Sequence, residues 1–236
     1  MHVLITRPRR DADELAARLH ALGHSTFIEP LIDIVARAGP PLDLSGVQAL
    51  LLTSANGARA AATRTAERAI LVLAVGPATA ATARQLGFLN VSESGGEGVE
   101  GLARHARATL TSTKGTLLHP AGTATAGDLQ ASLQSAGFVV RKEVIYEARA
   151  AEALSGALTA ELGAVSITAS MFFSPRTAAL FASLTAAAGL APACRGIVAL
   201  TLSEAVAKAL APLVFRRLLV AAQPETDAML DLLTQA

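Results

Sequence analysis

The sequence predicts an α/β protein with parallel sheets flanked by helices, and two observations point to it. Short aliphatic runs alternate with Ala-rich amphipathic segments, and turns rich in Ser, Thr, Gly or Pro separate them. This alternation is typical of βα units, which build parallel sheets. Several of these units also occur twice in similar form. The repetition predicts two similar domains of about 100 residues each.

The first unit shows the pattern most clearly. Residues 2–6 form an aliphatic run of strand length, and Asp11 with Glu14 three residues later predicts a helix start with a capping box. The helix is expected to stop at Gly23, where glycine tolerates the backbone that ends a helix. A second strand at residues 25–29 follows before Pro30.

The same reading continues along the chain. Further strands are expected at residues 31–36, 47–53, 70–75, 88–91, 116–119, 138–140, 142–148, 166–173, 197–201 and 218–222. Further helices are expected from about Asn56, at 77–86, from the 94–98 loop to Leu110, before Gly137, at 177–188, at 204–210 and from Glu225. Strands and helices therefore alternate over the whole length.

The repeats are written in the order A, B′, A′, B. HVLITRP resembles TLLHPAG, LLLTSANGARAAA matches MFFSPRTAALFA, and LAVGPATAATARQLG matches VALTLSEAVAKALAP. The pattern alone leaves open whether A folds with B or with B′. Residues 31–36 and 142–148 stand outside the units and alternate like strands, which predicts a pair of linker strands between the domains.

The composition fits a packed globule. The 236 residues are 52% hydrophobic and 17% charged with a net charge of +1, which excludes a disordered chain and a charge-rich coiled coil. No overall field attracts nucleic acid or an anionic membrane. With no Trp and one Tyr, little is present to stack on bases or a flavin. Any bound anion must be held locally.

The chain is expected to be cytoplasmic. Cys194 is the one cysteine, so no intramolecular disulfide forms. The apolar run at the N-terminus ends at Arg7 and is shorter than the apolar core of a signal peptide. The uncharged stretch at 177–194 contains Gly189 and Pro192, which favours a helix and a loop over a membrane span.

The turns that follow the strands are the expected ligand site, because a parallel sheet gathers them at one edge. Unpaired helix N–H groups at such an edge suit carboxylates or phosphates. On capping frequency alone, each turn residue by itself is better explained as a helix cap than as a ligand contact, and the recurrence in both repeats favours binding. The turn residues are Thr6, Arg7, Thr53, Ser54, Asn56, Gly76, Thr79, Gly122, Thr123, Ser174, Arg176 and Ser203.

Established cofactor motifs are not found. No GxxxxGK[ST] occurs, and Gly95, Gly96 and Gly98 are too tightly clustered for a dinucleotide fingerprint. His20 and His24 have a metal-like spacing, but the helix ends between them and no third ligand is near. We therefore expect neither NAD or ATP nor a metal.

Hydrolase chemistry is also unsupported, because His105 and His119 have no GxSxG serine to pair with. The single Tyr146 lies on the expected linker strand at 142–148. A phenol there can act as a general acid toward a ligand. From spacing alone, the favoured interpretation is that Tyr146 lies at a strand edge with its hydroxyl in water.

Six motifs together resemble the uroporphyrinogen-III synthase family, in the order of that family and over essentially the whole chain. They are VLITRP, LLLTSANGA, LAVGPATA, FFSPRTA, SEAVAKAL and the tyrosine of EVIYEA. The resemblance implies two flavodoxin-like or Rossmann-like domains joined by a two-stranded β linker. It implies that residues 1–34 and 152–236 form domain 1, that 46–140 form domain 2 and that 31–38 and 141–150 are linker strands, so that A folds with B.

The resemblance also implies a reaction. Hydroxymethylbilane, a linear tetrapyrrole with eight carboxylates, would be cyclised without a cofactor to uroporphyrinogen III, with inversion of ring D and loss of water, in haem biosynthesis. Tyr146 matches the family tyrosine thought to assist loss of the ring A hydroxyl. Ser54 and Ser174 match paired turn serines, and Thr79 matches the threonine after the VG turn.

Two departures from the family pattern concern the binding groups. LTLSEAVA leaves Ser203 where many members have Gly and Thr, and PAGTATAG replaces an Arg-Gly turn. We expect Arg7 and Arg176 to supply the charge instead, while the turn residues from Ser54 to Ser203 fix the carboxylate arms.

A non-enzymatic two-lobed module that binds a small molecule at the same turns is the alternative function. A degenerate synthase-like domain kept for interaction ranks behind it. In either enzymatic or binding form we expect a monomer with no nucleic acid or membrane partner, and at most a transient contact with the preceding enzyme of the pathway.

Overall fold

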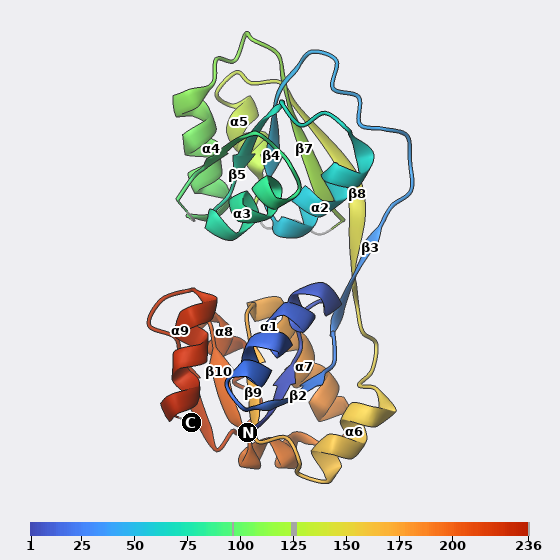
Figure 1. The fold of residues 1–236 in the computed structure, drawn as a ribbon, viewed down its shortest axis with the longest axis vertical. Coiled ribbons are helices and arrows are strands. Elements are labelled where there is room, and N and C mark those ends of the chain that lie inside the picture. Colours follow the sequence, from blue (N-terminus) through green and yellow to red (C-terminus); the bar gives the residue numbers. More distant parts are fainter. Residues whose placement is uncertain (96, 124–126, 236) are drawn as a thin grey trace. The chain divides into compact units, whose positions relative to one another are not determined.

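The computed structural model describes residues 1–95, 97–123 and 127–235 (Figure 1). The chain divides into two compact units, Met1–Asp33 with Arg149–Ala236 as unit 1 and Ile34–Ala148 as unit 2. Each unit has one sheet with helices packed against it. The predicted α/β class with parallel sheets flanked by helices is confirmed.

The sheet of unit 1 has five strands in the order β11-β10-β9-β1-β2. All four neighbouring pairs are parallel. The strands are β1 (His2–Ile5), β2 (Ser25–Ile28), β9 (Ala169–Phe172), β10 (Val198–Thr201) and β11 (Arg217–Val220). Strands from both ends of the chain thus lie side by side in one sheet.

Successive residues of β1 point to opposite faces of this sheet, and each face is covered by helices. Val3 and Ile5 pack with α1 (Arg9–Ala21) and α9 (Thr226–Asp231). Leu4 packs in the cluster on the other face. That face is covered by α6 (Gly156–Gly163), α7 (Pro175–Ala187), the 3-10 helix η1 (Ala191–Gly196) and α8 (Glu204–Ala209).

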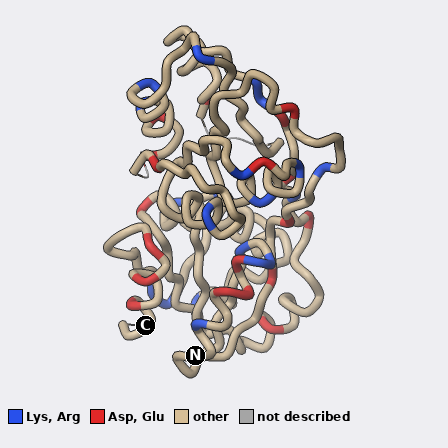
Figure 2. The backbone as a smooth tube through the Cα atoms, turned by 45° about the horizontal axis from the view of Figure 1, so that its top comes forward, with Lys and Arg blue, Asp and Glu red and all other residues tan. Residues whose placement is uncertain are grey.

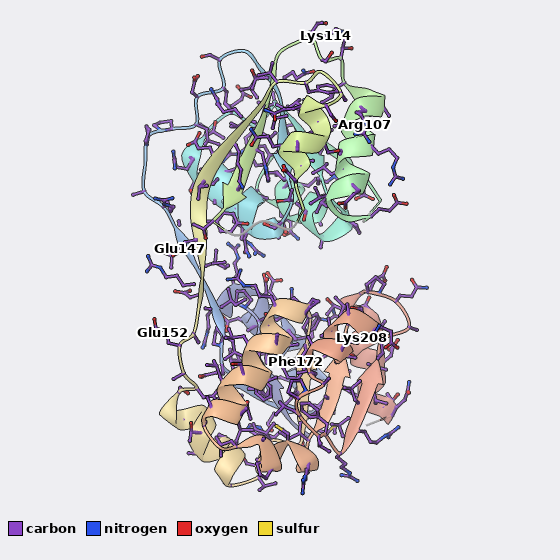
Figure 3. The ribbon with its side chains drawn as sticks, turned by 180° about the vertical axis from the view of Figure 1, so that it is seen from behind. Arg107, Lys114, Glu147, Glu152, Phe172 and Lys208 are labelled. Atoms are coloured by element: carbon purple, nitrogen blue, oxygen red, sulfur yellow. The ribbon has the colours of Figure 1, made fainter. Side chains whose placement is uncertain are left out.

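The aromatic centre of unit 1 lies between its sheet and α7. Phe172 ends β9 and is fully buried (labelled in Figure 3). Its ring centroid lies 5.1 Å from that of Phe181 on α7. The side chain of Phe172 therefore joins the sheet to the helix that follows it.

The sheet of unit 2 has six strands in the order β3-β8-β7-β4-β5-β6. They are β3 (Ile32–Ala36), β4 (Val47–Leu52), β5 (Leu71–Ala74), β6 (Asn90–Glu93), β7 (Thr116–Gly122) and β8 (Val140–Ala150). The pairs from β8 to β6 are parallel. Hydrogen bonds from Arg37 N–H to the Ile145 carbonyl and from Ala151 N–H to the Leu31 carbonyl show that β3 runs antiparallel to β8.

Four helices cover the two faces of the second sheet. α2 (Ala55–Arg64) and α3 (Pro77–Gln85) pack on the face that holds Leu50 and Leu52. α4 (Gly98–Thr109) and α5 (Leu129–Gln134) pack on the face that holds Leu51. The continuous aliphatic run of β4 therefore reflects burial on both faces.

The strand order repeats between the units. β10-β9-β1-β2 in unit 1 corresponds to β5-β4-β7-β8 in unit 2. The paired sequences HVLITRP and TLLHPAG form the equivalent strands β1 and β7. β8 is longer than β2 and is joined by β3 on its outer side. Unit 2 therefore carries one more strand than unit 1.

The predicted capping box at the start of α1 is wrong. The helix begins at Arg9 with Pro8 as its N-cap, and no side chain caps it. Pro8 has an extended backbone with ψ of 142°, and its carbonyl accepts the first helical hydrogen bond from Ala12 N–H at 3.0 Å, so the helix begins before Asp11. The predicted ends near Gly23 and Gly137 are confirmed, with φ of 81° and 83° in the turns that close α1 and α5, where the two glycine N–H groups donate to the carbonyls of His20 and Gln134.

Two further predictions about elements need correction. The strands expected at 138–140 and 142–148 are one strand, β8. Arg141, between the two expected strands, is not a turn residue but pairs with Leu118 of β7. α6 and η1 were not predicted. α6 is preceded by Ser155, whose hydroxyl oxygen accepts a hydrogen bond from Leu158 N–H at 3.0 Å, so the sequence does contain a capping signal for it.

In the part of the chain that the structure describes, no helix is both long and apolar enough to cross a bilayer. Figure 2 shows basic and acidic residues interspersed along the backbone of both units. The balanced net charge thus corresponds to a mixed distribution of the two signs.

Candidate functional site

The candidate site in unit 2 lies where β5, β4 and β7 end. These strands are parallel neighbours, so the residues after them meet at one edge of the sheet. Gly76 follows β5, Ser54 follows β4, and Gly122 ends β7. Tyr146 lies in the longer β8, directly opposite Gly122.

Tyr146 is a buried side chain with a specific hydrogen bond. It is 8% exposed and belongs to the apolar cluster between the sheet and α2. Its hydroxyl lies 3.0 Å from Ser54 Oγ. Tyr146 does not lie at the edge of the sheet, because β8 lies between β3 and β7, and its hydroxyl has a protein partner in Ser54. Figure 3 labels Glu147, the next residue along β8.

Gly122 makes room for the ring of Tyr146. A Cβ built on Gly122 would lie 2.7 Å from Tyr146 Cε2 and Cζ, closer than real side chains approach. The ladder between β7 and β8 has an irregularity between Ala121 and Gly122, and Thr123 N–H donates to the Tyr146 carbonyl at 3.2 Å. The end of β7 therefore fixes both the backbone and the ring of Tyr146.

Ser54 is the N-cap of α2. Its backbone is extended, with φ of −161°, and its Oγ accepts a hydrogen bond from Gly57 N–H at 3.0 Å. A Cβ on Gly57 would lie 3.2 Å from the Pro120 carbonyl and 3.9 Å from Tyr146 Cε1. Gly57 thus lets the first turn of α2 approach the tyrosine.

The other predicted residues of unit 2 flank this pair along the edge. Asn56 lies in the first turn of α2, where its Oδ1 accepts from Arg59 Nη1 at 2.9 Å. Gly76 is the N-cap of α3, with Pro77 at the first helical position. Thr79, one turn into α3, is 5% exposed. The edge therefore combines two helix starts with the tyrosine.

His119 lies within the same edge, behind the turn. It is 3% exposed on β7, and its Nε2 lies 3.2 Å from the Thr53 hydroxyl. Burial, with the charge of Lys142 on the neighbouring strand as a smaller cause, lowers the pKa of His119 from 6.5 to about 4. The imidazole is thus neutral at pH 7 and serves as a hydrogen-bonding partner of Thr53.

Unit 1 gathers its predicted residues at the equivalent edge. Arg7 follows β1, and its guanidinium carbon lies 4.4 Å from the centre of the Phe173 ring, while its Nη2 lies 3.5 Å from Asp11 Oδ2. Phe173 directly follows β9, so Arg7 lies beside the turn that carries Ser174.

The serines of unit 1 start two helices. Ser174 Oγ accepts from Thr177 N–H at 3.2 Å and donates to Thr177 Oγ1 at 2.9 Å. Arg176 lies in the first turn of the same helix, α7. Ser203 is the N-cap of α8 but makes no side-chain capping bond. Arg7, Ser174 and Arg176 therefore lie close along the edge, with Ser203 after the neighbouring strand β10.

The sequence named Ser54, Gly122 and Tyr146 without relating them, and the structure brings them together. Gly57 was not identified as a site residue from the sequence, although a comparison of the two repeats points to it. Aligning LLLTSANGA with MFFSPRTA places Gly57 opposite Thr177, the residue that bonds the equivalent serine. His119 was rejected as a catalytic histidine, and its contact with Thr53 depends on the pairing of β7 with β4.

Comparisons with known proteins point in one direction. The model of the family described as uroporphyrinogen-III synthase HemD matches residues 13–231. The solved uroporphyrinogen-III synthetase from Helicobacter pylori 26695 is 18% identical with a TM-score of 0.65, over 99% of this chain and 98% of that chain. A mutant uroporphyrinogen III synthase from the extremely thermophilic bacterium Thermus thermophilus is 16% identical with a TM-score of 0.56, over 100% and 98%. No curated protein matches the chain.

Proposed function

Because the chain belongs to the uroporphyrinogen-III synthase family, cyclising hydro-lyases of porphyrin biosynthesis, we propose the full reaction for it. It converts hydroxymethylbilane into uroporphyrinogen III with inversion of ring D and loss of water. One observation carries this assignment: the single tyrosine lies at the ligand-binding edge of a parallel sheet, with its ring and hydroxyl both fixed. A fixed phenol suits proton transfer to a departing group.

Tyr146 gives its proton to the hydroxyl that leaves ring A. The carbon–oxygen bond breaks, water departs, and the methylene carbon of ring A bonds to the ring D carbon that already carries the bridge to ring C. That bridge bond then breaks and re-forms at the opposite α-carbon of ring D, which inverts the ring. The proton that ring D loses when its aromatic system is restored returns to the phenolate, so the overall change is loss of one water. The folded position of the substrate directs the closure, because the reacting ends must be held together.

The carboxylate arms are held by the turns. The proposed binding residues are Arg7, Ser54, Asn56, Gly76, Thr79, Gly122, Thr123, Ser174, Arg176 and Ser203. Ser54 takes part through the backbone N–H groups of the helix start that it caps, because its hydroxyl contacts Tyr146. Backbone N–H groups at the starts of α2, α3 and α7 attract carboxylates, and arginine pairs with them through two nitrogens. This explains how a protein with a net charge of +1 can hold eight carboxylates.

The enzyme works as a monomer in the cytoplasm and needs no cofactor, with at most a transient contact to the enzyme that makes its substrate. Residues 31–38 and 141–150 serve as linker strands between the two domains. Support for the monomer comes from the mixed distribution of charge and from the scattering of the exposed apolar residues, such as Leu22, Leu89 and Val214, along the described chain.

Incubation of the purified protein with hydroxymethylbilane tests this function. The products are oxidised and the porphyrin isomers are separated. We expect the type III isomer, whereas hydroxymethylbilane without enzyme closes to type I. Formation of type I alone would overturn the proposal, and tight binding of hydroxymethylbilane in that case would favour the non-enzymatic binding module.

Tyr146→Phe tests the role of the phenol. The ring keeps its packing on Gly122, but the proton is lost, so kcat should fall by roughly a hundredfold or more. The rate of type III formation under saturating substrate measures this. A rate equal to that of the unmodified enzyme would remove the tyrosine from the mechanism, while circular dichroism confirms that the variant is folded.

A further inference from the structure

The hydroxyl of Ser54 has one proton to give, and the structure restricts where it goes. Ser54 Oγ already accepts the N–H of Gly57 at 3.0 Å. A serine hydroxyl carries one donor and two acceptor positions. In the described residues, the hydrogen bonds of Ser54 Oγ are this one and the 3.0 Å contact with Tyr146. In the part of the chain that the structure describes, the Tyr146 oxygen is the acceptor available to the Ser54 proton, and either hydroxyl can be the donor in this contact.

The other repeat shows that this arrangement is specific to unit 2. Ser174 is the equivalent N-cap, and its Oγ likewise accepts a backbone N–H from the residue three positions later. Its proton goes to the hydroxyl of that residue, Thr177, at 2.9 Å. In unit 2 the equivalent residue is Gly57, which has no hydroxyl to accept it. Glycine at position 57 thus frees the Ser54 proton for Tyr146.

We propose that Ser54 is a positioning residue, which donates its hydroxyl proton to the Tyr146 oxygen and thereby turns the phenolic proton away from the protein toward the substrate. The role rests on the proposed function of Tyr146 as a proton donor. Gly122 fixes the plane of the ring and Ser54 fixes the direction of the O–H bond. After proton transfer, the same serine donates to the phenolate, and hydrogen bonds to a charged oxygen are the stronger kind.

The contact itself can be tested without substrate. The chain has one tyrosine, so protein labelled with ¹³C at tyrosine Cζ gives a single resonance. Ser54→Ala should shift this resonance, because the phenol loses its hydrogen-bond partner. Ser174→Ala removes the equivalent capping hydroxyl in unit 1 and should leave the resonance in place. An unshifted resonance in Ser54→Ala would overturn the proposal, whatever reaction the protein catalyses.

Kinetics then separate positioning from helix capping. Ser54→Ala should lower kcat about tenfold with little change in KM, the loss expected for one hydrogen bond that acts in the transition state. Ser54→Thr keeps a hydroxyl and should restore most of kcat. In a Tyr146→Phe background, Ser54→Ala should cause no further loss of kcat, because the group it orients is gone.

Ser155→Ala is the matched control for activity, since Ser155 caps α6 in the same way and lies outside the proposed site. It should lower thermal stability about as much as Ser54→Ala while kcat stays unchanged. A further tenfold loss of kcat in the Ser54→Ala, Tyr146→Phe double variant would contradict positioning. Type I product from the unmodified protein would instead contradict the proposed function, even with the resonance shifted.

Discussion

At the scale of single residues, Tyr146 shows how much a sequence can reveal and where it stops. It stands out as the one tyrosine of the chain, and the resemblance to a family attaches a role to it. Its partner Ser54 is 92 positions away, and only the pairing of β4, β7 and β8 brings the two hydroxyls together. The sequence likewise gives no partner for His119, because its partner Thr53 lies 66 positions away.

His119 should make the folded protein sensitive to acid. Its pKa is 6.5 when unfolded and about 4 in the fold, because burial disfavours the charged ring. Between these values the unfolded chain binds a proton that the folded chain does not, so stability falls as pH falls from about 6.5 toward 4. From pH 7.5 to 5.0 the loss from this residue amounts to about 2 kcal/mol.

His119→Gln keeps a hydrogen-bonding side chain beside Thr53 without a titrating group. Urea unfolding at pH 7.5 and 5.0 should show a smaller difference for this variant than for the unmodified protein. His105→Gln is the control, since His105 is another histidine of unit 2 with a hydroxyl partner, its Nε2 lying 2.8 Å from the Ser92 hydroxyl. Equal pH dependence in His119→Gln and the unmodified protein would show that the pKa of His119 is the same in the folded and the unfolded chain.

At the scale of elements, the end of β7 and the middle of β8 act together. The irregularity after Ala121 changes the pairing so that Gly122 faces Tyr146, and the close approach of backbone and ring requires glycine. The sequence predicted the end of a strand near His119 and a separate strand at 142–148. It could not show that β7 extends through Pro120, because β7 lies between two neighbours that keep it extended.

Gly122→Ala should displace the ring of Tyr146. The added Cβ lies 2.7 Å from two ring atoms, so the ring must move and the Ser54 contact is lost. We expect about 1–3 kcal/mol of lost stability from such overpacking, together with reduced turnover. Thermal unfolding measures the loss of stability, the tyrosine Cζ resonance measures the displacement of the ring, and the rate of type III formation measures turnover.

Gly163→Ala is the matched control, because a Cβ at this position of α6 meets nothing within 4 Å. This variant should leave the tyrosine resonance unchanged and should not lower stability, since alanine favours the helix more than glycine does. If Gly122→Ala behaves like Gly163→Ala in both measurements, the close contact with Tyr146 does not constrain the ring.

At the scale of the whole molecule, each unit has its own core. Among the described residues, the four apolar clusters divide two and two between the units, and none draws on both. Proteins built in this way can depart from a single unfolding transition. The chain carries a convenient probe in each unit, Cys194 in unit 1 and Tyr146 in unit 2, and each is the one residue of its kind.

We expect Cys194 to react with thiol reagents only when unit 1 opens. The side chain is fully buried, and burial raises the pKa of its thiol to about 11, so little thiolate is present at pH 8. Phe181→Leu, a substitution on the buried face of α7, should cost about 1 kcal/mol and speed labelling about fivefold. Tyrosine fluorescence, which reports on unit 2, should keep its urea midpoint.

Val72→Ala in the core of unit 2 provides the reciprocal variant. It should lower the urea midpoint of tyrosine fluorescence and leave the rate of Cys194 labelling unchanged. Should each variant move both probes to the same extent, the units unfold as one cooperative body.

The sequence by itself determined the α/β class, the two repeats and nearly every strand, because hydrophobic periodicity and turn residues are local signals. It also identified the turn residues as candidates for ligand binding, and the family resemblance indicated which reaction to test. The tertiary structure decided which strands are neighbours, since pairing joins segments far apart in the chain. That pairing alone sets Gly122 against the ring of Tyr146 and gives Ser54 a second partner besides its own helix.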